Sequence, residues 1–273
     1  MSSLDLDLRS AASPATDIWR GLTAFSAALL ALMLLWAAAG EPRAVGGVAV
    51  WMKPAKFALS FVVLFGTIAL VADRLSPGVR HGWTMRILGL GMGIAMIAEM
   101  GWMIRQASRG AASHFNFGTP LEAFMYQTVM GSGAVFLVLS IGIIGWIAWR
   151  DRGADLGPAL REGVWLGFLL SFVLTLVVAG AMSTGTGPHV GVHPEGAPTL
   201  PLFGWSGVAG DLRPAHFAAL HAMQALPLLG LWLDGRGAAR SVRTVRLAAI
   251  GWTALTAGLF AQGLLGMPLI RLG

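Results

Sequence analysis

Cysteine is absent from this 273-residue chain, so disulfides, thiolate metal sites and cysteine nucleophiles are excluded. Charge is also scarce, because only 12% of the residues are charged, whereas a soluble globular domain usually carries about 25%. Hydrophobic residues make up 56% of the chain, and the mean hydropathy is +0.70. This composition places the chain in the membrane class of proteins.

The chain also lacks a contiguous run of basic residues, although its formal net charge is +6. The arginines are spread through short loops between apolar segments, so we expect no nucleic-acid partner. No internal repeat and no soluble domain stand out. The basic balance is therefore interpreted through membrane topology.

The N-terminal region lacks the features of a signal peptide. Residues 1–20 are largely polar and slightly acidic, and an apolar stretch follows from Leu22 to Ala39. A signal peptide has a short basic region and an apolar core of about 7–15 residues. We interpret the first apolar stretch as a retained transmembrane helix.

Seven stretches have the roughly 20 largely apolar residues that a helix needs to cross a bilayer. The sequence therefore predicts an all-α polytopic membrane protein, a bundle of seven transmembrane helices in a single domain of residues 1–273. The predicted spans are 21–39, 57–75, 83–105, 122–148, 162–182, 215–233 and 245–267.

The distribution of basic residues predicts the orientation. Twelve of the 19 lie on the side that holds the N-terminus, and the other seven lie on the opposite side. The more basic side is expected to face the cytoplasm. The prediction is a bacterial inner-membrane protein with its N-terminus cytoplasmic and its C-terminus outside.

The first of three polar stretches stands at the start of span 2. Pro54 suits the first turn of a helix, where its missing N–H has no partner to lose. Lys53 and Lys56 are three residues apart and share a helix face. Two interpretations stay open. The lysines either reach lipid headgroups beside Trp51 or form a cationic clamp for a phosphate or carboxylate.

The second polar stretch runs from span 3 into the loop that follows. Glu99, Gln106 and Arg109 fall on one helical face, and Glu99 lies about two turns inside the span. A carboxyl group at that depth is protonated, paired or bound to a cation. The simpler alternative is a structural ion pair with Arg or Lys. In the loop, His114 is a candidate ligand or acid/base group, and Asn116 is a candidate polar contact.

The third polar stretch opens span 6, where Asp211 and Pro214 mark a helix start. Four polar side chains lie within roughly 140° of one face of this helix. They are Arg213, His216, His221 and Gln224. Two histidines on one face suggest a metal, haem or proton-transfer site. Their five-residue spacing does not fix a metal, and hydrogen bonding between helices is the alternative.

The loop before span 6 is long and rich in Gly and Pro, which suggests a mobile cover. Its segment from His189 through His193 to Glu195 is similar to a loose cation-binding loop.

The three stretches together resemble an uncharacterised group of bacterial polytopic membrane proteins. The resemblance covers the chain from span 2 to span 6 and implies no particular activity. The motifs are Lys53-Pro54-x-Lys56-Phe57, Gln106-Ala107-x-Arg109-Gly110 with Ser113-His114-Phe115-Asn116, and Gly210-Asp211-Leu212-Arg213 with His216-Phe217, His221, Gln224 and Leu226-Pro227. A looser similarity is to seven-span hydrolases of the ceramidase and progestin/adipoQ-receptor type, although their paired histidines are four residues apart.

The leading hypothesis is an outward-facing polar pocket built by spans 2, 3 and 6. It would bind haem b or a divalent metal such as Zn or Fe, and the protein would be a membrane-embedded enzyme acting on a lipid or another anionic substrate. Alternatives are a transporter or receptor without chemistry, and an assembly subunit. The predicted roles are catalytic for His114, His221, Glu99 and Asp211, metal-ligating for His114, His216 and His221, and substrate-binding for Lys53, Lys56, Arg109, Arg213, Gln106, Asn116 and Gln224.

Overall fold

The computed structural model describes residues 14–185, 187–194, 196–237, 239 and 241–272. The fold is all-α, and seven helices are long and apolar enough to cross a membrane. The chain divides into two compact units. Unit 1 is Met1–Ser140 with Arg150–Asp155, and unit 2 is Ile141–Trp149 with Leu156–Gly273.

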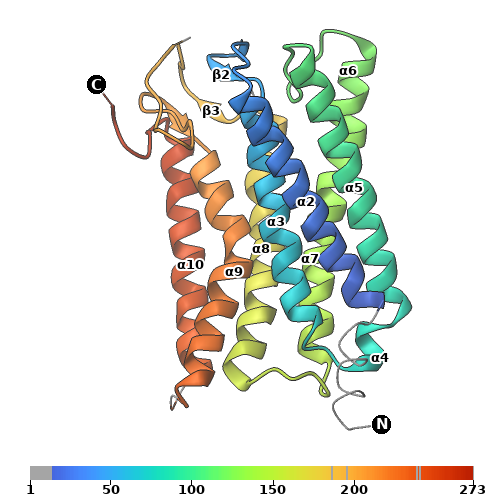
Figure 1. The fold of residues 1–273 in the computed structure, drawn as a ribbon. Helices are drawn as coiled ribbons and strands as arrows, with labels where there is room; N and C mark the ends of the chain where they lie inside the picture. Colours follow the sequence, from blue (N-terminus) through green and yellow to red (C-terminus); the bar gives the residue numbers. More distant parts are fainter. Residues whose placement is uncertain (1–13, 186, 195, 238, 240, 273) are drawn as a thin grey trace. The chain divides into compact units, whose positions relative to one another are not determined.

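Unit 1 begins with α2, which packs on α3, and both helices contact α5 (Figure 1). A short hairpin separates α2 from α3, and a π-helical segment interrupts the fourth span. The elements are α2 (Pro14–Ala38), β1 (Ala44–Val45), β2 (Val48–Ala49), α3 (Met52–Ala72), α4 (Pro77–Arg80), α5 (Trp83–Ser108), α6 (Pro120–Phe124), η1 (Met125–Met130) and the first half of α7 (Gly131–Arg150).

Unit 2 holds the end of α7 and three long helices, of which α8 and α9 make the most extensive contact while α10 contacts both. Figure 1 shows these three helices side by side. Its elements are α8 (Pro158–Thr184), β3 (His189–Val190), β4 (Gly210–Asp211), α9 (Arg213–Gly235) and α10 (Ser241–Leu264).

The seven predicted spans are confirmed as helices, with shifted ends. The second span begins at Met52 instead of residue 57, so Lys53 and Lys56 lie in the first turns of α3. Pro54 lies within the first turn, where no N–H donor is required. The third span extends to Ser108. The first polar stretch is therefore built into the start of a helix, and the second begins within the end of one.

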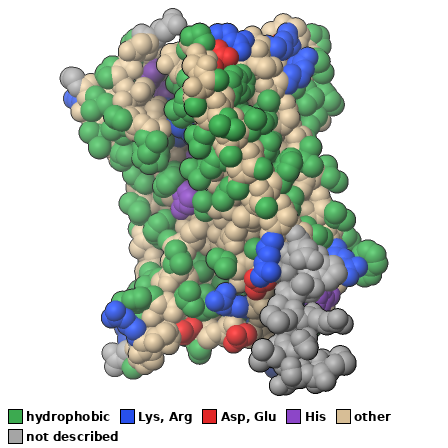
Figure 2. Space-filling model, viewed as in Figure 1, with side chains coloured by type: hydrophobic (Ala, Val, Ile, Leu, Met, Phe, Trp, Pro, Cys, Tyr) green, Lys and Arg blue, Asp and Glu red, His purple; other side chains and the backbone are tan. Residues whose placement is uncertain are grey.

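Hydrophobic side chains cover the length of the helices, while Lys and Arg gather mostly toward the helix ends (Figure 2). Leu35, Ile94, Leu228 and Ile250 are each more than half exposed along their helices. Such exposure is unusual on a water-soluble monomer and suits contact with lipid tails.

The α8–α9 contact depends on glycines that bring the two backbones together. A Cβ added at Gly163 or Gly167 would collide with the backbone of α9 at Leu226 or Ala222, and one at Gly230 would collide with Ala159 of α8. Gly163 and Gly167 form a GxxxG motif, a common contact face in membrane helices. The motif was readable in the sequence and was missed.

Asp234, near the C-terminal end of α9, caps the N-terminal end of α8. Its carboxylate accepts hydrogen bonds from the backbone N–H groups of Ala159 and Leu160, at 3.0 and 2.8 Å. These N–H groups are in the first turn of α8, which has no partner for them within the helix. Tight packing and this cap fix α9, which carries four of the five predicted site residues of unit 2.

Candidate functional site

The predicted site residues fall into two groups, and each group belongs to one compact unit. A single site shared by both groups stays a prediction, so each group is described by itself. Unit 1 holds Lys53, Lys56, Glu99, Gln106, Arg109, His114 and Asn116, and unit 2 holds Asp211, Arg213, His216, His221 and Gln224.

Glu99 is the most deeply placed carboxylate among the described residues of the spans, nine residues before the end of α5. Its side chain lies in the interior, since the residue is only 4% exposed. Gly133 leaves room for it, because a Cβ at that position would lie 3.4 Å from Glu99 Oε1. Lys53, in the first turn of α3, is near enough for its charge to act on Glu99. The arrangement suits a carboxyl group that is balanced by a nearby cation within the membrane.

His114, in the loop that follows α5, lies within electrostatic range of the same lysine. Its ring is flanked by Phe57 and Tyr126, with ring centroids 5.6 and 5.7 Å away. Ser113 Oγ lies 3.0 Å from His114 Nδ1. Burial, and next the charge of Lys53, lower the pKa of His114 from 6.5 to about 3. The imidazole is therefore neutral at physiological pH and takes part in hydrogen bonding without adding charge.

The backbone around His114 is unusual at two places. Phe115 has a positive φ of 52°, which is uncommon for a bulky residue. Its ring lies 5.0 Å from that of Tyr126, which belongs to the π-helical segment η1. Strained backbone and π-helical turns are both frequent at functional sites. The residues around His114 that the sequence did not predict, Phe57 and Tyr126, come from two different spans.

Gln106 and Asn116 hold this loop together. Gln106 is fully buried and its Nε2 donates to Glu122 Oε1 at 3.1 Å and to the carbonyl of Ala112 at 3.2 Å. Asn116 Nδ2 donates to the same carbonyl at 2.9 Å. Thr119 caps the start of α6, because its Oγ1 accepts from the Glu122 N–H at 3.2 Å and donates to Glu122 Oε2 at 3.0 Å. Both amides thus have a structural role, and the sequence reasoning missed Glu122, which the Thr-x-x-Glu spacing could have indicated.

Three further basic residues of unit 1 lie in the same segments as Lys53 and His114: Arg109, Lys56 and Arg43. Arg109 is exposed just after α5, where its charge acts on Glu122. Lys56 is half-buried in α3. Arg43 in the hairpin region is paired with Glu41 at 2.8 Å and donates to the carbonyl of Ser108, which ties the hairpin region to the end of α5.

In unit 2, Asp211 and Arg213 form an ion pair with each other. The Asp211 side chain is fully buried, and its Oδ2 lies 2.5 Å from Arg213 Nη2. Burial alone would raise the pKa of Asp211, but the hydrogen bonds and charge of Arg213 hold it below its ordinary value. Arg213 Nη2 also donates to the carbonyl of Gly204, and the N–H of Ser206 donates to Asp211. The pair therefore connects the long loop to the start of α9. The sequence predicted catalysis for Asp211 and anion binding for Arg213, and it did not predict this structural role.

Two histidines of this loop lie against the ion pair. His189 Nε2 is 3.1 Å from Arg213 Nη2, and the His189 and His193 rings stack with centroids 4.0 Å apart. Burial and then the Arg213 charge lower the pKa of His189 to about 4. The cation-binding loop expected here included Glu195, which lies outside the described residues.

The described residues give metal or haem binding no support. Within the described part of the chain, no three His, Cys, Asp or Glu side chains lie close enough together to hold a metal ion. Metal binding shared by His114 of unit 1 with His216 and His221 of unit 2 stays a prediction.

The histidines of α9 differ in their surroundings. His216 Nδ1 is buried without a hydrogen-bond partner. His221 Nδ1 lies 3.1 Å from Gln224 Oε1, one turn along the helix. The ring of Phe217 packs against His221 at 4.2 Å. The predicted placement of His221 and Gln224 on one face is confirmed by their contact.

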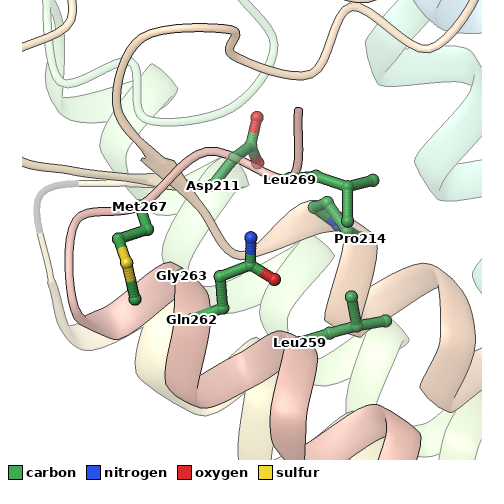
Figure 3. Close-up of a pocket in the computed structure, with 7 residues that line it drawn as sticks. All are labelled: Asp211, Pro214, Leu259, Gln262, Gly263, Met267 and Leu269. Carbon is green, nitrogen blue, oxygen red and sulfur yellow. The ribbon is translucent and has the colours of Figure 1, made fainter. Parts of the chain in front are cut away.

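A small hollow also lies in unit 2, beside Asp211 and the end of α10 (Figure 3). Gln262, Met267 and Leu269 contribute to its wall, and the Gln262 amide donates to the carbonyl of Pro268 at 2.8 Å. The hollow has no room for even a water molecule, whereas small-molecule sites enclose roughly 300–1,000 Å³. We assign it no ligand.

Comparison with known proteins gives one partial similarity. The chain is 31% identical over 154 residues to a DNA translocase FtsK of Bradyrhizobium diazoefficiens, a match that covers 52% of this chain. It spans only 17% of that protein's length. No protein-family model matches the chain, and no solved structure matches it significantly. The comparisons therefore assign no family.

Proposed function

We propose that this multi-pass protein resides in the bacterial inner membrane and binds a small anionic ligand at the outward end of unit 1. The observation that carries the proposal is that Lys53 lies within electrostatic range of both Glu99 and His114, which are themselves largely buried. A lysine, a deeply placed carboxyl group and a neutral imidazole offer one cation and adjustable hydrogen-bonding groups to a phosphate or carboxylate.

The charge of this end supports an anionic ligand. The segments 39–57 and 99–126, which contain the α2–α3 connection and the end of α5 with its loop, hold five basic residues and three carboxylates. Glu41 is already paired with Arg43. Basic residues on the outward side run against the positive-inside tendency, so topology does not account for them. A bound anion does.

The exposed aromatic residues around Tyr126 support access from the membrane surface. Phe117 is 57% exposed and Phe115 is 39% exposed. Both rings lie within 6 Å of the Tyr126 ring. Aromatic rings are enriched in the headgroup region of a membrane, so we expect this end of unit 1 to lie there. A lipid headgroup and a free anion then both have access to it.

The proposal is tested by ligand-dependent stabilisation of the purified protein, since a ligand that binds only the folded state raises the melting temperature. The free probes are inorganic phosphate and succinate. The lipid probe is phosphatidylglycerol, compared with phosphatidylcholine in nanodiscs. At least one probe should stabilise the wild type, and Lys53→Gln should abolish that effect.

Arg20→Gln is the matched control, because it removes a positive charge of unit 1 from an exposed pair with Asp73. It should keep the full ligand effect. Stabilisation by phosphate or succinate in detergent assigns a free anion, and stabilisation only by phosphatidylglycerol assigns a headgroup. A wild type that none of the probes stabilises, or a Lys53→Gln protein that responds fully, would overturn the proposal.

The orientation is tested separately, because the chain has no cysteine of its own. Val48, in the hairpin before α3, is 45% exposed, and Arg152 is exposed in the loop after α7. In intact cells, a membrane-impermeant thiol reagent should label Val48→Cys and spare Arg152→Cys. The reverse pattern would place the candidate site on the cytoplasmic side.

A further inference from the structure

A polar pair interrupts an apolar, exposed face of α9. Phe217, His221, Gln224, Leu228 and Leu231 follow spacings of four, three, four and three, which place them on one side of the helix. The phenylalanine and the two leucines are 44%, 64% and 45% exposed. Apolar side chains need no partner in lipid, whereas an imidazole and an amide at the same face are costly there. The pair therefore points to a ligand with hydrogen-bonding capacity.

Gln224 fixes the hydrogen-bonding state of His221. Because the amide oxygen Oε1 accepts, the Nδ1 atom that faces it at 3.1 Å carries the hydrogen. In the neutral imidazole, the other ring nitrogen, Nε2, then holds a lone pair and is an acceptor. A ligand that complements it brings an O–H or N–H donor.

An aromatic wall continues from His221 toward the loop before α9. The His221 ring lies against Phe217, which meets Phe203 and Trp205 edge-on at 5.7 and 5.8 Å. Phe203 and Trp205 stack on each other at 4.4 Å, and Phe203 is 41% exposed. Leu202, next to them, has a positive φ of 67°, which the loop adopts against the preference of leucine. The exposed parts of the Phe203 and Phe217 rings suit contact with a flat aromatic headgroup.

The depth of His221 selects a lipid-soluble ligand. His221 is the ninth residue of α9, so it lies about 12 Å along the helix from its first residue. That distance places it inside the apolar part of the span, and a ligand reaches it from the bilayer. The ligand combines an apolar body, a planar ring and a hydroxyl donor.

We propose that this face of α9 binds the headgroup of a membrane-soluble quinol, with a quinol O–H donating to His221 Nε2 and the ring lying against Phe217. The site is built entirely within unit 2 and does not depend on the anion site of unit 1. Only binding is proposed, without electron transfer.

The test is equilibrium binding of decyl-ubiquinol to the full chain in nanodiscs under anaerobic conditions. The matched probe is decyl-ubiquinone, which keeps the ring substituents and the decyl chain but has carbonyl acceptors in place of the hydroxyl donors. Decyl-ubiquinol should bind the wild type, and decyl-ubiquinone should bind about tenfold more weakly, the effect of one lost hydrogen bond. His221→Phe, which keeps a ring without an acceptor, should also lose about tenfold in quinol affinity.

Two further variants make the result decisive. Gln224→Leu leaves the imidazole in place but frees its tautomer, and it should weaken quinol binding severalfold, so it also serves if His221→Phe fails to fold. His81→Phe, which changes a histidine outside the spans in unit 1, should bind like the wild type. Wild-type affinity in both His221→Phe and Gln224→Leu, or no quinol binding by the wild type, would overturn the proposal. A Soret absorption band that disappears in His221→Phe would also overturn it, since haem iron would then occupy Nε2.

Discussion

The close approach of α8 and α9 gives a sharp prediction at Gly167. An alanine Cβ there would lie 2.7 Å from the carbonyl oxygen of Ala222 and 3.0 Å from Pro227 Cδ. Neither neighbour is the end of a flexible side chain, so α9 has to move by several tenths of an ångström. Overpacking of this kind costs about 1–3 kcal/mol of unfolding free energy. Replacing glycine in a helix by alanine returns about 1 kcal/mol through helix propensity.

Gly180→Ala in the same helix is the matched control, because a Cβ there meets nothing within 4 Å. It receives the propensity gain without the collision and should be slightly more stable than the wild type. The difference between the two alanine variants therefore isolates the helix–helix contact, and we expect Gly167→Ala to be the less stable by about 1–3 kcal/mol. The free energies are measured by reversible unfolding in one detergent, followed by tryptophan fluorescence.

Equal stability of the two alanine variants would refute the reasoning that backbone contact positions α9. The functional consequence is also measurable. Since α9 carries both residues of the proposed quinol contact, Gly167→Ala should weaken decyl-ubiquinol binding while Gly180→Ala leaves it unchanged.

Three further predictions concern polar groups. Asp211→Ala should destabilise the protein by about 3 kcal/mol in thermal unfolding, because it leaves Arg213 without its buried partner; a loss below 1 kcal/mol would mean that the ion pair is dispensable. Asp234→Ala should cost about 1 kcal/mol by uncapping α8, whereas Glu162→Gln, at an exposed pair, should be near neutral. Burial lowers the pKa of His114 from 6.5 to about 3, so the unfolded chain binds a proton that the folded chain does not. The stability contribution is complete above pH 6.5 and is lost as the pH falls toward 3. The melting temperature of His114→Gln should therefore fall less over that range, and an unchanged pH profile would contradict the burial of His114.

In unit 1, the sequence predicted which residues share a helix face but not which partners they bind in the loop. Helical phase placed Glu99, Gln106 and Arg109 on one face, and the structure confirms that the first two point into the interior. Helical phase did not show that Gln106 donates hydrogen bonds to Glu122 and Ala112. Those partners lie beyond a turn whose geometry depends on the whole loop. The Lys53 and His114 neighbourhood needed the packing of α3 and η1 against the end of α5.

The same division holds in unit 2. The contact between His221 and Gln224 was predictable from the sequence, because residues three apart on a helix are neighbours. Arg213 was interpreted from sequence as an anion clamp, but the fold closes it onto Asp211 and His189. A buried carboxylate needs a partner, and only the path of the 185–212 loop decides which cation lies near enough.

The sequence by itself determined the membrane class, the seven helices and the polar stretches at their ends. Hydropathy and helical period are local properties, and in lipid every backbone group must be satisfied within its own helix. Tertiary structure alone decided which polar side chains pair across loops and between elements. Gln106 with Glu122 and His189 with Arg213 are such pairs, and they depend on loop conformations that no local pattern encodes.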